Sequence, residues 1–94
     1  MHEEALLKDL RRKVEEVAIA RNALRVSSIS LWVGALSHLT GEQLRARWPE
    51  LVAGSVAEGS ELVIDFSTEL NDPNAQGIIL KSLNIIPRDG GGDR

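Results

Sequence analysis

Residues 25–36 read Arg-Val-Ser-Ser-Ile-Ser-Leu-Trp-Val-Gly-Ala-Leu and alternate between apolar and mostly polar side chains. This period of two is typical of a β-strand. One side of the predicted strand is aliphatic and consists of Ile29, Leu31 and Val33. The other side consists of Ser28, Ser30 and Trp32. Because serines favour a half-solvated face, we expect helices to cover only the aliphatic side of the sheet.

The segments around this strand predict two helices. Residues 4 to about 24 form an amphipathic pattern, whose apolar stripe consists of Leu6, Leu7, Leu10, Val14, Val17, Ala18 and Leu24. A second helix is predicted to begin at Thr40, because Thr40 and Gln43 have the spacing of a capping box. We expect Pro49 to kink or break this helix, since proline removes a helical hydrogen bond. Gly54 is predicted to end it.

Two further strands are predicted in the second half of the chain. Residues 61–67 place Leu62, Ile64 and Phe66 on one face. Residues 78–86 alternate imperfectly, with Ile79, Leu83 and Ile85 on the same face as Lys81. The connection between these strands, residues 68–77, is rich in turn-forming residues.

The predicted order of elements is therefore α-β-α-β-β. We predict an α+β fold in which two helices pack on one face of a three-stranded sheet. Residues 1–86 form the predicted domain, and residues 87–94, which contain three consecutive glycines, form a predicted flexible tail.

Composition excludes several classes of function. The 94 residues include no cysteine, so disulfides, thiolate zinc sites and a cysteine nucleophile are excluded. A net charge of −3 argues against nucleic-acid binding, which needs an excess of lysine and arginine on one face. Residues 29–36, the longest mostly apolar run, are too short to span a membrane. The first residues lack the basic region of a secretory signal, and we expect a cytoplasmic protein.

Catalytic motifs are equally scarce in the sequence. The chain has no Gly-rich phosphate loop and no His-Glu-x-x-His pattern. Ser37 precedes His38, but adjacent residues rarely adopt the geometry of a catalytic triad, and no carboxylate partner is evident. We therefore expect no enzyme activity.

The first three residues, Met1, His2 and Glu3, offer a set of nitrogen donors. The α-amine of Met1, the backbone amide and imidazole of His2, and the backbone amide of Glu3 can surround one ion in a plane. Four such nitrogens suit Ni(II) or Cu(II) better than Zn(II), which prefers tetrahedral coordination. By itself, a histidine at position 2 is more simply an ordinary terminal residue.

Several segments in sequence order resemble the HypA/HybF family of hydrogenase-maturation nickel metallochaperones. They are Met1-His2-Glu3 and residues 5–7, 14–18, 31–37, 54–62 and 80–85. In that family the N-terminal residues bind nickel, and the protein delivers it to the large subunit of [NiFe]-hydrogenases with the help of a nickel-binding GTPase. The resemblance thus implies transient Ni(II) binding by Met1, His2 and Glu3, and both of these protein partners.

The sequence departs from the family in one respect. The family carries a zinc ribbon with two Cys-x-x-Cys pairs between its last two strands, whereas here residues 68–77 form only a short loop. We therefore expect no zinc. The loss also leaves an alternative open, namely a metal-free HypA-like structural subunit or adaptor that docks on a hydrogenase or its maturation machinery. A strand edge exposed by the loss could also pair with a second copy to give a homodimer.

His38 is the only other histidine of the chain. It follows the predicted strand 25–36, and a fold of this family could bring that connection near the N-terminus. His38 is therefore a candidate auxiliary nickel ligand or transfer group. The competing interpretation is a surface histidine beside a helix cap, which is the more common situation.

Overall fold

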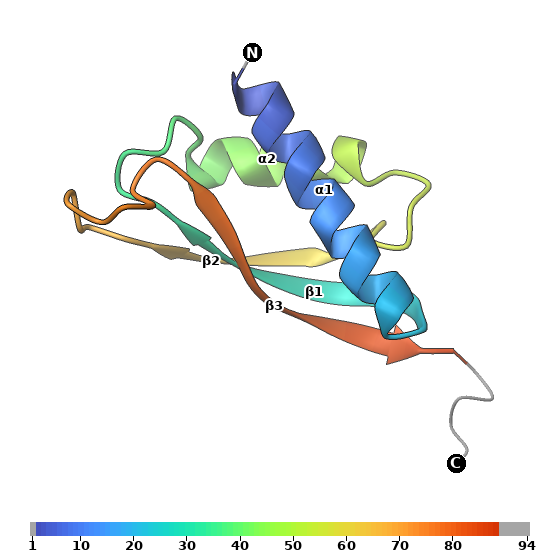
Figure 1. The fold of residues 1–94 in the computed structure, drawn as a ribbon. Helices are drawn as coiled ribbons and strands as arrows, with labels where there is room; N and C mark the ends of the chain where they lie inside the picture. The colour runs from blue at the N-terminus through green and yellow to red at the C-terminus, as the bar shows by residue number, and fades with distance from the viewer. Residues whose placement is uncertain (1, 89–94) are drawn as a thin grey trace.

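The computed structural model describes residues 2–88, with the side chains of His2 and Glu3 excepted. Its five elements follow the predicted order (Figure 1). They are α1 (His2–Ala20), β1 (Ala23–Val33), α2 (Gly41–Leu51), β2 (Glu61–Phe66) and β3 (Ile78–Pro87). Neither helix of the described chain is long and apolar enough to cross a membrane.

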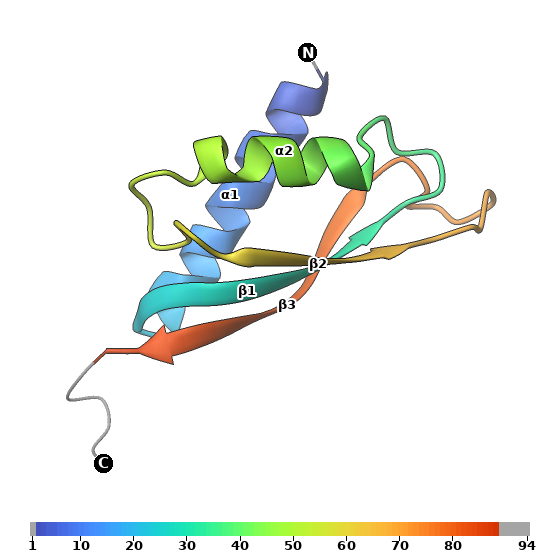
Figure 2. The ribbon, with the colours of Figure 1, turned by 180° about the vertical axis from the view of Figure 1, so that it is seen from behind.

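The long strand β1 lies at the centre of the sheet, whose strand order is β2-β1-β3. β1 pairs in parallel with β2, with Leu31 opposite Ile64, and antiparallel with β3, with Leu31 opposite Leu80. A parallel pair requires a crossover connection, which α2 supplies here. Both helices lie on the same face of the sheet (Figure 2), which confirms the predicted α+β architecture.

The hydrophobic core fills the space between this face and the two helices. Its members with no more than 2% exposure include Leu7, Val14, Val26, Ile29, Leu31, Leu44, Trp48 and Val52. The aliphatic side of β1 therefore faces the helices, as its alternation predicts. The opposite side carries the half-buried Ser28, Ser30 and Trp32.

Helix α1 ends four residues earlier than predicted. Asn22 adopts a left-handed conformation with φ of 55°, which asparagine tolerates better than most residues. The chain then enters β1 at Ala23, which pairs with Pro87. Leu24, predicted to continue the apolar stripe of the helix, belongs to this strand and is 49% exposed. Its helical spacing was misleading because the turn at Asn22 changes the direction of the chain.

Helix α2 begins with the predicted capping box. The Thr40 hydroxyl accepts a hydrogen bond of 3.1 Å from the Gln43 amide, and the Thr40 amide donates one of 2.9 Å to the Gln43 side chain. The predicted break at Pro49 does not occur, because Pro49 lies in the last turn and the helix continues to Leu51. Gly54 does not end the helix either, since the C-cap is Val52.

Strand β3 contains an irregularity that explains its imperfect alternation. Ser30 pairs with Ser82 but the next residue, Leu31, pairs with Leu80, so Lys81 is an extra residue in β3. The bulge reverses the faces of the strand. Ile78 and Leu80 pack on the core before it, whereas Leu83 and Ile85 do so after it. The prediction that Ile79 shares the face of Leu83 was therefore wrong, and Ile79 is 41% exposed.

The ends of the last two strands also differ slightly from expectation. Phe66 lies on the face of Leu62, as predicted, because the pairing of β2 with β1 is uninterrupted and the Phe66 ring lies against Gly41 at the start of α2; at the end of the strand it is nevertheless 59% exposed. β3 reaches Pro87, and the Arg88 amide donates a hydrogen bond of 3.3 Å to the Asn22 carbonyl. The rest of the predicted tail, residues 89–94, lies outside the described residues.

Candidate nickel site at the start of helix α1

The predicted nickel ligands lie at the very start of α1. Met1 and the side chains of His2 and Glu3 are outside the described part of the structure, so the geometry of the ligand set stays a prediction. The backbone of His2 and Glu3 forms the first turn of the helix. The first four N–H groups of an α-helix have no carbonyl partner within the helix. The amide nitrogens of these two residues can therefore bind a metal without a loss of helical hydrogen bonds.

One flank of this helix end is held to α2 by charged groups. We define the ionic flank as the surface formed by Glu4, Leu7, Arg11, Arg47, Glu50 and Leu51. Arg47 Nη2 lies 2.9 Å from Glu4 Oε1. This hydrogen bond, together with the positive charge of Arg47, holds the pKa of the Glu4 carboxyl below its usual value. Arg11 Nη1 also donates a hydrogen bond of 2.8 Å to the Leu51 carbonyl at the end of α2.

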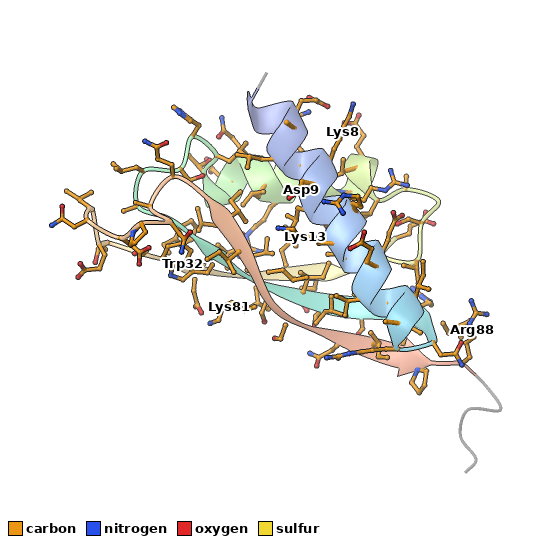
Figure 3. All side chains as sticks on the ribbon, viewed as in Figure 1. Lys8, Asp9, Lys13, Trp32, Lys81 and Arg88 are labelled. Atoms are coloured by element: carbon orange, nitrogen blue, oxygen red, sulfur yellow. The ribbon has the colours of Figure 1, made fainter. Side chains whose placement is uncertain are left out.

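The side of α1 that faces solvent is a balanced charged surface. Figure 3 shows Lys8, Asp9 and Lys13 along the first half of the helix. Lys13 Nζ lies 3.3 Å from Asp9 Oδ2, and Arg12 pairs with both Asp9 and Glu16. The hydrogen bonds from Arg12 and Lys13 hold the pKa of the Asp9 carboxyl below its usual value. Arg11 pairs with Glu15, so each residue of the basic run 11–13 has a carboxylate partner.

The other flank of the helix end faces a cleft of about 350 Å³ lined by Ala5, Leu6, His38 and Gln76. We call this surface the neutral flank. The fold thus brings His38, the only histidine whose side chain is described, to a cleft beside Ala5 and Leu6 of α1.

Two loops hold this cleft together. The Leu36 amide donates a hydrogen bond of 2.7 Å to the Ala75 carbonyl, and the Gly34 amide donates one of 2.9 Å to the Gly77 carbonyl. Ala75 is buried, with 4% exposure. The contact requires glycine at position 34, because a Cβ atom there would lie 2.1 Å from the Ala75 carbonyl oxygen. The 34–40 loop, which carries His38, and the 67–77 loop, which carries Gln76, are therefore packed against each other.

The sequence did not identify Ala5, Leu6 or Gln76 as site residues. No motif links them, since the cleft is formed by contacts between segments about 30 to 40 residues apart in the chain. Within residues 2–88, described side chains do not form a cluster of three or more histidines, aspartates or glutamates that could hold a metal.

The sequence is similar to proteins of one known family. Residues 1–70 match a family model described as "Hydrogenase/urease nickel incorporation, metallochaperone, hypA". The chain belongs to the HypA family. It is 41% identical over 64 residues to a hydrogenase maturation factor HypA of Azorhizobium caulinodans, and 38% identical over 65 residues to one of Nitrosospira multiformis. A HypA of the archaeon Methanosarcina acetivorans is 34% identical over 65 residues.

The alignments with these relatives cover about two thirds of this chain and about half of each relative. The aligned segments span 68% to 69% of the chain, but only 57%, 56% and 49% of these three relatives. The family match ends at residue 70, inside the 67–77 loop. The cleft wall at Gln76 and the whole of β3 therefore lie beyond the part of the chain that the family model matches.

Proposed function

We propose that this protein is a nickel-binding accessory protein, a metallochaperone, for the maturation of [NiFe]-hydrogenase. In this proposal Ni(II) is the cargo and is bound transiently. The ligands are the α-amine of Met1, the backbone amide and imidazole of His2, and the backbone amide of Glu3. The observation that carries the proposal is the family match, which begins at residue 1 and extends over residues 1–70.

The start of α1 is chemically suited to such a site. The amides of His2 and Glu3 lie in the first helical turn, where N–H groups lack helical acceptors. A positive ion near a helix N-terminus is normally unfavourable, because the helix dipole is positive there. Loss of the two amide protons on binding supplies two negative charges, which balance the charge of Ni(II). The complex therefore adds no net positive charge to the helix end.

The partners follow from the same proposal. They are a nickel-binding GTPase of the maturation pathway and the large subunit of a [NiFe]-hydrogenase, and the location is the cytoplasm. A homodimer stays a prediction that light scattering can check. We propose neither a resident zinc ion, since the chain has no cysteine, nor a catalytic reaction.

Nickel titration of tag-free protein that retains the Met1 amine tests the proposal. We expect a single Ni(II) per chain with the absorption band of a planar, low-spin complex. His2→Ala should abolish binding, and so should a Gly-Ser extension ahead of Met1, because each removes a donor. His38→Ala is the matched control, since it removes the other imidazole but leaves the four donors intact. Unchanged affinity in the His2→Ala or extended protein would overturn the proposed site.

One observation favours a second candidate function. The match ends at residue 70 and the aligned segment spans only about half of each relative. A HypA-like domain of this kind could be a metal-free structural subunit or adaptor on a hydrogenase or its maturation machinery. Failure to bind nickel, together with a stoichiometric complex with a hydrogenase subunit in size-exclusion chromatography, would favour this second function over the first.

A further inference from the structure

Three exposed arginines lie where α1 ends, where β1 begins and where β3 ends. They are Arg21, Arg25 and Arg88. Within residues 2–88, none of these three side chains forms an ion pair or a hydrogen bond. The other arginines of this part of the chain are all engaged by carboxylates or by a backbone carbonyl, and they are Arg11, Arg12, Arg45 and Arg47. The uncompensated guanidinium groups are therefore gathered in one region.

The pairing of β1 with β3 brings these three arginines to the same end of the molecule. The Arg88 amide donates a hydrogen bond of 3.3 Å to the carbonyl of Asn22, the neighbour of Arg21. Arg25 pairs with Ile86, two residues before Arg88. Figure 3 shows Arg88 at this end of the sheet. A helix of 19 residues is about 28 Å long, so α1 separates this surface from the two flanks described above.

Arg25 also lines a cleft of about 500 Å³, together with Leu24, Ser55, Val56, Glu58 and Gly59. Arg25 Nη2 lies 3.7 Å from the position that a Cβ atom on Gly59 would occupy, so the guanidinium group lies beside the 55–59 loop. The Glu58 carboxylate accepts a hydrogen bond of 3.3 Å from the Gly54 amide instead of pairing with Arg25. The cleft thus offers an uncompensated cation beside the apolar side chains of Leu24 and Val56.

Exposed aliphatic side chains accompany the three arginines. Ile19 is 78% exposed, Leu24 49% and Ile86 44%. We call the surface formed by these three residues and the three arginines the arginine end. Arginine is enriched at protein–protein interfaces, and its planar fork can bind both oxygens of a carboxylate. Positive charges interspersed with aliphatic groups complement a segment in which carboxylates alternate with aliphatic side chains.

We propose that the arginine end binds an acidic segment of a partner protein. A carboxylate of that segment accepts two hydrogen bonds from Arg25 in the cleft, and an aliphatic side chain packs on Leu24. Further carboxylates pair with Arg21 and Arg88. A nucleic acid is a poorer match, because the chain has a net charge of −3, the cleft contains Glu58 and the arginine end has no aromatic side chain for base stacking. The inference does not depend on nickel binding.

The test is the binding of a fluorescein-labelled peptide, Glu-Leu-Glu-Gly repeated three times, to the full chain, measured by fluorescence anisotropy at physiological ionic strength. We expect Arg25→Gln to weaken binding about tenfold, because bidentate, charge-assisted hydrogen bonds are strong. Arg21→Gln and Arg88→Gln should each weaken it about threefold, as is typical of exposed ion pairs. Urea unfolding checks that each variant folds.

Arg12→Gln is the matched control, since it removes the same charge from an arginine that is already paired with Asp9 and Glu16. It should change the affinity by less than about twofold, because its charge is compensated and screened. Equal losses in Arg12→Gln and Arg25→Gln would show an effect of net charge alone and would overturn the proposal. A second control is the same peptide with glutamine in place of glutamate, which should not bind. Equal affinity for both peptides would contradict carboxylate recognition.

Two further results would replace the proposed partner by another. Tighter binding of a single-stranded oligonucleotide of the same charge would identify a nucleic acid and rule out the acidic segment. Residues 89–94 contain Asp89 and Asp93. Binding of the peptide only after Asp89→Asn and Asp93→Asn are combined would show that the chain's own carboxylates occupy the surface. If the wild-type protein ignores the peptide, the arginine end is no acidic-segment site, whatever the nickel titration gives.

Discussion

The two flanks of the N-terminal end of α1 present opposite kinds of chemistry. The ionic flank is lined by Glu4, Arg11, Arg47 and Glu50, with Arg47 in contact with Glu4 and Arg11 in contact with the last carbonyl of α2. The neutral flank is lined by Ala5, Leu6, His38 and Gln76 and carries no carboxylate or guanidinium group. The same helix end is therefore attached on one side and accessible on the other.

This difference gives the two sides of the helix end different roles in the fold. The ion pair between Arg47 and Glu4 and the hydrogen bond of Arg11 attach the first turns of α1 to α2. The neutral flank presents the imidazole of His38 from the 34–40 loop and the amide of Gln76 from the 67–77 loop. Helix α2 connects the two flanks, since its first residue follows the cap at Thr40 and its middle carries Arg47. Three changes to this arrangement differ in the size of their expected effects.

The largest effect is expected from Gly34→Ala, which separates the two loops that build the neutral flank. A Cβ atom at position 34 would meet the Ala75 carbonyl oxygen at 2.1 Å, so backbone must move. We expect the free energy of unfolding, measured in urea, to fall by about 3 kcal/mol, at the upper end of the usual cost of overpacking.

Gly77→Ala is the matched control for this change, because it lies in the same pair of loops. A Cβ atom there would meet the Asn74 carbonyl oxygen at an ordinary 3.6 Å. Its unfolding free energy should stay the same or rise by up to about 1 kcal/mol, since alanine restricts the unfolded chain. Equal losses in the two variants would show that the contact between Gly34 and Ala75 does not hold the flank.

A smaller effect is expected from Thr40→Ala, which removes the cap that lies two residues after His38. The variant loses the hydroxyl that accepts from the Gln43 amide, and we expect a loss of about 1 kcal/mol in the free energy of unfolding. Thr40→Ser keeps the hydroxyl and should retain most of the stability. If serine and alanine destabilise equally, the capping box contributes nothing and the loop is held by Leu39 alone.

The smallest effect is expected on the ionic flank, from Glu4→Gln. The pKa of Glu4 is lowered by the hydrogen bond and charge of Arg47, so its contribution to stability is full above the ordinary pKa of a glutamate. The contribution is lost as the pH falls through the lowered pKa. Thermal unfolding should therefore show a slight loss for Glu4→Gln at neutral pH that disappears in acid, since surface ion pairs contribute little. A difference that persists at low pH would contradict an electrostatic role.

Much of the fold was predictable because its elements obey simple periodicities. The alternation of residues 25–36 predicted the central strand and the side that the helices cover, and the Thr40–Gln43 spacing predicted the start of α2. The errors lie where one residue interrupts a period. Asn22 ends α1 before Leu24, and the bulge at Lys81 moves Ile79 to the exposed face. Such interruptions depend on pairing with distant strands, so local spacing does not reveal them.

The candidate site likewise has one part that the sequence predicts and another part that only the folded structure reveals. By itself, the sequence determined the family and the nitrogen-rich start Met1-His2-Glu3, because these depend on the order of residues along the chain. Only the tertiary structure decided that Glu4 is paired with Arg47, and that Ala5, Leu6, His38 and Gln76 line one cleft. The physical reason is that three separate segments meet there only after the core has packed and Gly34 has allowed the 67–77 loop to approach.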